Sequence, residues 1–261
     1  MVYERLSFFC TVLVLTFCIM VGTGNARGVT VGIAFSMPPY VIRDNNTGLE
    51  VDIIRESFAL AGMDAEFQYL PARRLSVALA DGIVDCVASN VAFNISRETG
   101  LETFDSEVTL FYQNYAVSME SSGYAIRSIE DLKDKTVLGF SNAAKYLGPE
   151  YLAMITGNKK YTELSDQALQ VRMLYSGRTQ VVISDKRIFL YWRKMLLQMP
   201  IAEIIDLNQG IQFFKIFPPA PRHLSFRDNE LRDAFDKGLH ILRKSGVYKA
   251  ITQRYTGVER E

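Results

Sequence analysis

The hydrophobic positions of the chain follow two periodicities, a spacing of two residues and a spacing typical of helices. Residues 29–35 are β-branched and alternating, and the prolines that follow Met37 end this pattern because proline cannot donate to a strand ladder. Apolar residues at positions 51, 53, 54, 58 and 60 then have helical spacing up to about Gly62. The start of the pattern therefore predicts a strand followed by a helix.

This alternation continues and then occurs a second time. A strand at 67–70, a helix at 75–80 and a buried strand at 83–89 complete a first β-α-β-α-β set. The second set begins with a capping-box helix start at Ser128–Asp131. It continues with strands at 136–140 and 180–184 and with helices at 144–155, 165–175 and 186–197. Two such sets predict two α/β lobes whose sheets are covered by helices.

Two extended aromatic runs, residues 110–117 and 211–216, separate the sets, and we interpret them as strands that cross between the lobes. After the second run, a helical stripe over 231–242 and a last helix at 247–255 return to the first lobe. The predicted fold class is α/β and two-lobed, with a mixed sheet flanked by helices in each lobe. The expected divisions are a signal segment 1–26, first lobe 27–113, second lobe 114–212 and first-lobe return 213–261.

The beginning of the chain has the pattern of a secretory signal. Residues 6–21 are almost wholly apolar, with Arg5 before them and small residues up to Ala26 after them. The apolar run is shorter than the roughly 20 residues that span a bilayer comfortably, which disfavours a retained anchor. We expect cleavage after Ala26 and a periplasmic location. Cys86 would then be the single cysteine, so we expect no internal disulfide and a buried thiol.

Composition and charge exclude several classes of function. Lys plus Arg and Asp plus Glu number 29 each, so no overall field favours nucleic acid. The two histidines, His223 and His240, lie near no cysteine, and no glycine-rich phosphate loop occurs. We therefore expect no metal, no cofactor and no catalytic residue, and we interpret both histidines as exposed or capping residues.

Seven short motifs follow one another along the chain. They are Pro38-Pro39-Tyr40, Gly48–Asp52, Gly82–Asp85, Ser96-Arg97, Ile129–Lys133, Gly177-Arg178 with Val181–Asp185, and the tail Asn229–Gly257. In this order and spacing the chain resembles the family 3 extracellular solute-binding proteins, the polar-amino-acid binders of ABC transporters. The resemblance implies a type II periplasmic-binding-protein fold that closes on a ligand held in the cleft between its lobes.

The resemblance also implies two charged ligand-binding residues. Arg97 aligns with the arginine that grips the ligand carboxylate, and its planar fork of donors suits that task; the alternative is a solvated helix face. Asp185 aligns with the acid that holds the ligand ammonium, and the alternative is a cap of the helix that follows. Because the two residues belong to opposite lobes, a zwitterion that contacts both would stabilise the closed state.

Uncharged residues complete the expected site. Tyr40 and Met37 would line its mouth, with core packing as the alternative. Asn90 and Asn94 could offer backbone and amide groups, with turn formation as the alternative.

The second-lobe turn departs from the family pattern. Asn142, Ala143 and Ala144 replace a Gly-Ser-Thr-like turn, and Ala92 and Asn94 replace the hydroxyl residues before the arginine. Backbone N–H groups remain at the turn to receive an anion. With these hydroxyls absent, a modified amino acid, a small peptide or another organic acid fits as well as a standard amino acid.

The predicted function is the binding of a small, amino-acid-like solute for ABC-type uptake. We expect a monomer without enzyme activity, whose partners are this small molecule and an ABC permease or a membrane sensor, and not nucleic acid. Two alternatives stay open. One is an enzyme resembling cyclohexadienyl or arogenate dehydratases, in which Asp185 or Glu50 would act as the acid. The other is a module that reports ligand to a membrane receptor.

Overall fold

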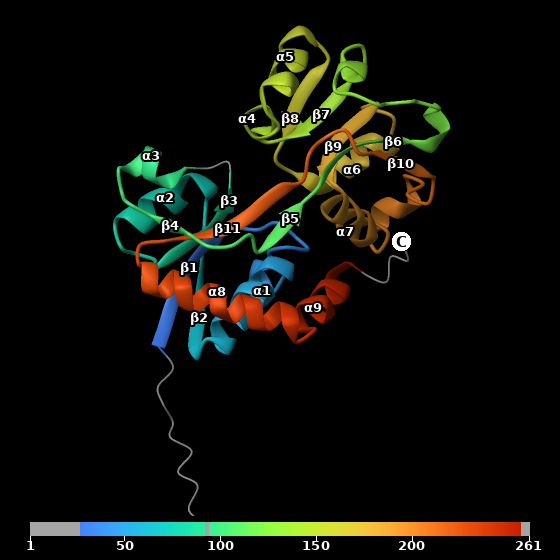
Figure 1. Cartoon of the computed structure of the whole chain (residues 1–261). Helices are drawn as coiled ribbons and strands as arrows, with labels where there is room; N and C mark the ends of the chain where they lie inside the picture. Colours follow the sequence, from blue (N-terminus) through green and yellow to red (C-terminus); the bar gives the residue numbers. More distant parts are fainter. Residues whose placement is uncertain (1–26, 92–93, 257–261) are drawn as a thin grey trace, which may run out of the picture.

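Two α/β lobes joined by extended strands form the molecule (Figure 1). The computed structural model describes residues 27–91 and 94–256. The first sheet has the strand order β2-β1-β3-β11-β4, and β5 also pairs with β11. Its strands are β1 (Arg27–Ala34), β2 (Met63–Leu70), β3 (Cys86–Asn90), β4 (Phe104–Asp105), β5 (Leu110–Tyr112) and β11 (Ala220–Phe226). Strand β1 is parallel to β2 and β3, whereas β11 is antiparallel to its neighbours, so the sheet is mixed.

Helices from both ends of the described chain cover the first sheet. They are η1 (Arg43–Asn45), α1 (Leu49–Leu60), α2 (Ala72–Ala80), α3 (Ile95–Thr99), α8 (Asn229–Lys244) and α9 (Val247–Thr256). Helices α1 and α8 pack closely, and the rings of Phe58 and Phe235 lie 4.9 Å apart at their centroids. Gly238 permits this approach, because a Cβ atom there would lie 1.9 Å from the carbonyl oxygen of Ser57. The return segment is therefore an integral part of the first-lobe core.

The second sheet has the strand order β10-β6-β9-β7-β8. Its strands are β6 (Asn114–Met119), β7 (Val137–Phe140), β8 (Tyr161–Leu164), β9 (Val181–Asp185) and β10 (Ile211–Phe214). Around it lie η2 (Glu120–Ser122), η3 (Glu130–Leu132), α4 (Ala143–Tyr146), α5 (Pro149–Gly157), α6 (Gln167–Tyr175), α7 (Lys186–Leu196) and η4 (Pro200–Glu203). Val181 and Ile183 of β9 join one hydrophobic cluster and Val182 joins another, because successive side chains point to opposite faces.

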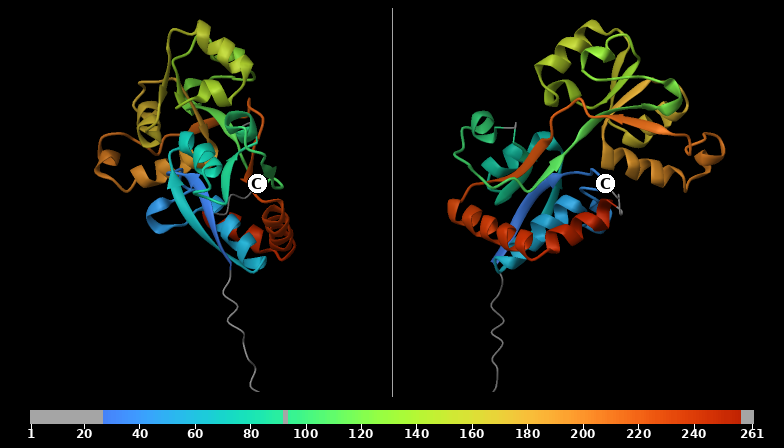
Figure 2. Two further views of the ribbon diagram at one scale, coloured as in Figure 1. Left: turned by 90° about the vertical axis from the view of Figure 1, so that its left-hand side faces the viewer. Right: turned by 45° about the vertical axis from the view of Figure 1, so that its right-hand side comes forward.

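The crossings between the lobes are short and lie together (Figure 2). Strand β5 ends in the first sheet and β6 begins in the second, with only Gln113 between them. The Gln113 side chain donates a hydrogen bond of 2.9 Å to the carbonyl oxygen of Phe217, in the returning connection. That connection runs between Phe214, the end of β10, and Ala220, the start of β11. Residues 213–214 thus pair in the second sheet, beyond the boundary at 212 that we expected.

Three local expectations were wrong in detail. The helix expected at 144–155 is two helices, because Gly148 adopts a positive φ of 90° and Pro149 begins α5. The capping box at 128–131 yields only the short η3, since the Asp131 carboxylate accepts the backbone N–H groups of Arg127 and Ser128 and closes a turn. The helix expected from 165 begins at Gln167, because Asp166 is its N-cap.

The expectation of a buried thiol at Cys86 is confirmed, because this residue is a free cysteine buried in β3. The expected signal segment 1–26 lies outside the described residues. Among the residues that are described, no helix has both the length and the apolar character needed to cross a membrane.

Candidate ligand-binding site

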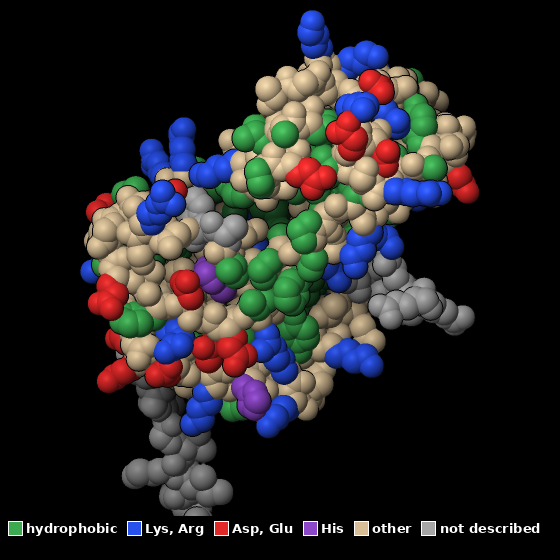
Figure 3. Space-filling view, turned by 45° about the horizontal axis from the view of Figure 1, so that its top comes forward, with side chains coloured by type: hydrophobic (Ala, Val, Ile, Leu, Met, Phe, Trp, Pro, Cys, Tyr) green, Lys and Arg blue, Asp and Glu red, His purple; other side chains and the backbone are tan. Residues whose placement is uncertain are grey.

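The expected site residues cluster at one edge of each sheet. Met37 and Tyr40 follow β1, and Arg97 lies on α3 after β3. Asn142 follows β7, and Asp185 is the last residue of β9. The surface is hollowed between the lobes, with Lys and Arg side chains along the first-lobe rim (Figure 3). Open α/β sheets bind ligands at the carboxyl ends of their strands, so these positions fit a ligand site.

Arg97 is an exposed cation on a fixed helix. Asn94 caps α3, and its Oδ1 atom accepts the backbone N–H of Arg97 at 2.8 Å. Helix α3 is tied to α2 by a bond of 3.1 Å from the Ser76 hydroxyl to the Glu98 carboxylate. Within the described part of the chain the guanidinium of Arg97 has no ion-pair partner. The guanidinium is therefore available to an anion, and Asn94 supports it by capping α3.

Asp185 is occupied by internal donors. Its Oδ1 atom accepts the backbone N–H groups of Arg187 at 2.8 Å and Ile188 at 3.2 Å, which confirms the helix-cap alternative. Its Oδ2 atom accepts the Gln113 N–H at 2.7 Å and the Tyr40 hydroxyl at 3.0 Å. Burial raises the pKa of the Asp185 carboxyl, although these hydrogen bonds oppose the shift. With four donors bound and 3% of its surface exposed, the carboxylate has no acceptor position left for a solute in this conformation.

Tyr40 packs in the core and also joins the two lobes. Its ring is fully buried and lies 3.9 Å from that of Tyr112 between centroids, so the core-packing alternative holds. Its hydroxyl donates to Asp185 and accepts a hydrogen bond of 3.2 Å from the Arg187 guanidinium. Burial, together with the nearby Asp185 carboxylate, raises the pKa of Tyr40 well above its usual value. The phenol therefore stays protonated and holds the second lobe to the first.

A buried ion pair at the base of the crossing strands was missed by sequence reasoning. Glu50 on α1 is fully buried. Its carboxylate accepts the Tyr112 hydroxyl at 2.7 Å and the Nε of Arg222 at 2.9 Å. Since Tyr112 belongs to β5 and Arg222 to β11, one carboxylate binds both crossings to α1. Its position among the apolar residues 49–54 was the one available signal.

The remaining first-lobe residues have structural contacts. Met37 is partly buried against the first-lobe core, and its N–H donates to the carbonyl of Val41 at 2.9 Å. Asn90 ends β3 at the register position opposite Arg222. Ala92 lies outside the described residues.

The second-lobe turn already holds a carboxylate. Asn142 adopts a left-handed φ of 63°, which asparagine tolerates, and Ala143 is buried. The N–H groups of Asn142 and Ala144 donate to Glu163 at 2.7 Å and 3.2 Å. The amides that we expected to receive a ligand anion thus bind an internal one.

The expectation for His223 was wrong, since this residue is buried on β11 and its Nε2 atom lies 3.1 Å from the Ser89 hydroxyl. Desolvation lowers the pKa of the imidazole, against the opposing effect of Asp105. His240 is exposed on α8, as expected.

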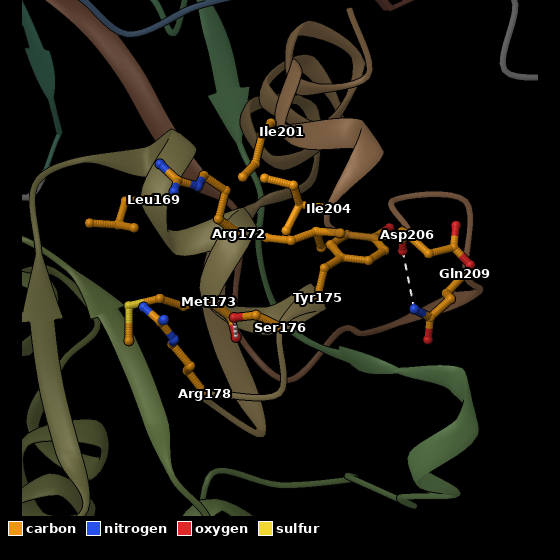
Figure 4. A pocket seen from close by; sticks show the side chains of 11 residues that line it. Leu169, Arg172, Met173, Tyr175, Ser176, Arg178, Ile201, Ile204, Asp206 and Gln209 are labelled. Carbon is orange, nitrogen blue, oxygen red and sulfur yellow. Dashed lines mark hydrogen bonds between the residues drawn. The ribbon is translucent and has the colours of Figure 1, made fainter. Parts of the chain in front are cut away.

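A second hollow of about 560 Å³ lies in the second lobe, between α6 and residues 201–209 (Figure 4). Tyr175, Arg172 and Asp206 are among its described lining residues, and none of the expected ligand-binding residues is. It is therefore separate from the site at the strand ends.

Curated relatives match almost the full length of the chain. It is 25% identical over 263 residues to the arginine-binding extracellular protein ArtP of Bacillus subtilis (strain 168), covering 94% of each chain. It is 23% identical over 245 residues to the probable amino-acid-binding protein YxeM of the same organism, covering 90% of this chain and 88% of that protein.

Solved structures share the two-lobed fold. The ligand-binding core of GluR0 in complex with L-glutamate aligns with a TM-score of 0.69 and 18% identity, over 90% of this chain and 100% of that one. An ancestral arginine-binding protein bound to glutamine aligns with a TM-score of 0.63 and 22% identity, over 88% and 98% of the two chains. The model of the bacterial extracellular solute-binding proteins, family 3, matches residues 29–258. The chain belongs to this family of solute-binding proteins.

Proposed function

We propose that the protein binds a small amino-acid-like solute between its lobes and holds the solute's carboxylate on Arg97. The observation that carries this is the exposed guanidinium of Arg97, fixed on α3 and unpaired within the described residues. A guanidinium offers two parallel N–H donors to a carboxylate and stays charged at any physiological pH. The names of the relatives, arginine-binding and probable amino-acid-binding, support this class of ligand.

Closure of the lobes would make binding selective for solutes that reach both. A solute stabilises the closed form only through contacts that the open form lacks. Asp185 stays a prediction as the acceptor of the ligand ammonium. In this role the ammonium would replace the Tyr40 hydroxyl on Oδ2, which requires closure to break that bond of 3.0 Å.

We propose further that the protein is exported to the periplasm after cleavage at Ala26, acts as a monomer and passes its ligand to an ABC permease. The alternative of a sensor for a membrane receptor needs the same ligand site. Co-purification of the tagged protein from membranes with a permease, or instead with a receptor, would distinguish the two.

We also propose binding without turnover. A dehydratase would need an acid open to the substrate, whereas Glu50 is fully buried and its carboxylate is bound by Tyr112 and Arg222. Incubation of the purified protein with prephenate or arogenate should leave both unchanged, and formation of product would refute this part of the proposal.

The test is a thermal-shift screen of amino acids, amines, organic acids and dipeptides, followed by calorimetry on the ligands that raise the melting temperature. Arg97→Ala should abolish binding and leave the ligand-free melting temperature unchanged, since the side chain is exposed. Arg74→Ala, which removes an exposed arginine from the neighbouring α2, is the matched control and should bind normally. Normal affinity in Arg97→Ala would refute the assignment.

A further inference from the structure

The Glu163 carboxylate accepts hydrogen bonds from three donors, on the second-lobe side of the hollow between the lobes. Glu163 lies on β8, at the register position opposite Gly139 of β7, and its carboxylate reaches the start of α4. Oε2 accepts the Asn142 N–H at 2.7 Å. Oε1 accepts the Ala144 N–H at 3.2 Å and the Tyr161 hydroxyl at 2.7 Å. The carboxylate is therefore bound from three directions.

The donors around Glu163 are arranged by the backbone. The left-handed conformation of Asn142 turns the two N–H groups toward one point, and a helix start leaves such groups without an internal acceptor. Tyr161 stands two residues before Glu163, on the same face of the strand. Burial, with an added effect of the hydrogen bond to Glu163, raises the pKa of Tyr161, so its hydroxyl keeps its proton and donates.

The occupied amides change what the second lobe can recognise. They are the groups that we expected to receive the ligand's anion, and a ligand carboxylate would now have to displace Glu163 beside a like charge. A carboxylate offers about four acceptor positions. Three are used here, and the exposed Glu163 side chain keeps one for an outside donor.

The opposite wall carries positive charge. Arg97 is exposed on α3 of the first lobe, on the same side of the crossing strands as α4 (Figure 1). We infer that Glu163 sets the charge selectivity of the cleft: it excludes a solute's carboxylate from the second lobe and favours solutes that end there in an ammonium or guanidinium group. This inference deepens the proposed function and rests on it for the position of the solute.

Glu163→Gln tests the selectivity by calorimetry with L-arginine, L-glutamine and L-glutamate. The wild type should bind L-arginine more tightly than L-glutamate, and the variant should reduce that ratio of affinities at least tenfold. Glu150→Gln, which removes an exposed acid from α5 of the same lobe, is the control for net charge and should leave the ratio unchanged. An unchanged ratio in Glu163→Gln would overturn the inference.

A second measurement needs no native ligand. In ¹⁵N–¹H spectra, sodium acetate should shift the Asn142 and Ala144 amides of Glu163→Ala and not those of the wild type, with sodium chloride as the control for ionic strength. Equal shifts in both proteins, or none in either, would overturn the inference. If no amino acid binds the wild type, the proposed function fails, while the acetate spectra still decide whether Glu163 excludes carboxylates from these amides.

Discussion

The hydrogen bond between Tyr40 and Asp185 crosses from one lobe to the other, and Tyr40→Phe removes it while keeping the buried ring. The substitution deletes the donor to Asp185 at 3.0 Å and the acceptor of the Arg187 guanidinium at 3.2 Å. A hydrogen bond to a charged group contributes about 1.5–3 kcal/mol. Because Asp185 is buried, water cannot replace the lost donor freely, so we expect the free energy of unfolding to fall by about 2 kcal/mol.

Thermal and urea unfolding at neutral pH measure this loss. For a chain of this size, about 2 kcal/mol corresponds to a fall of roughly 4–8 °C in melting temperature. Tyr112→Phe is the matched control, since it removes the same group from a buried ring that donates to Glu50 within the first lobe. It should also destabilise the protein.

A double-mutant cycle separates the two tyrosines. Tyr40→Phe and Asp185→Asn should show a coupling free energy of at least about 0.5 kcal/mol, whereas Tyr112→Phe and Asp185→Asn should show a smaller one, since Tyr112 makes its hydrogen bond to Glu50. A loss of less than about 0.5 kcal/mol for Tyr40→Phe, or additivity of its cycle, would refute a functional bond between the lobes.

Three further outcomes are expected. Gly238→Ala should cost roughly 1–3 kcal/mol of stability in urea unfolding, because its Cβ would lie 1.9 Å from the Ser57 carbonyl oxygen; wild-type stability would contradict this packing. The lowered pKa of His223 means that the unfolded chain binds a proton that the folded one refuses, so stability should fall as pH drops below about 6.5. His223→Gln should flatten that dependence, and an equal slope would exclude His223 as its source. Asp185→Asn keeps an oxygen to cap α7 and should, by calorimetry, weaken amine-bearing ligands more than ligands without an amine; equal weakening would remove Asp185 from the ligand site.

The spacing of apolar residues predicted most helices and strands, because this periodicity depends only on residues that are close in the sequence. Strand β11 was missed, since its sequence Ala-Pro-Arg-His-Leu-Ser-Phe shows little alternation and its burial comes from pairing with β3, far away along the chain. Arg222 and Glu50 are buried for the same reason, as each neutralises the other only in the folded state.

The candidate site, like the fold, was predicted only where neighbouring residues determine it. The helix-cap alternative for Asp185 follows from its own neighbours, and it holds. The bonds from Tyr40 to Asp185 and from Ala144 to Glu163 join residues 145 and 19 positions apart, and no spacing rule relates them. The sequence position of a carboxylate therefore could not reveal whether an internal donor already binds it.

Gln113, the single residue between β5 and β6, has its backbone N–H on Asp185 and its side chain on the carbonyl oxygens of Asn114 and Phe217. We expect a joint bonded in this way to act as a hinge, which allows the lobes to rotate and resists their translation. The relative orientation of the two lobes is then largely set before a solute binds, because these hydrogen bonds form when the chain folds. Ordering of the lobes on binding then costs little configurational entropy, so more of the free energy of the contacts contributes to affinity for the solute.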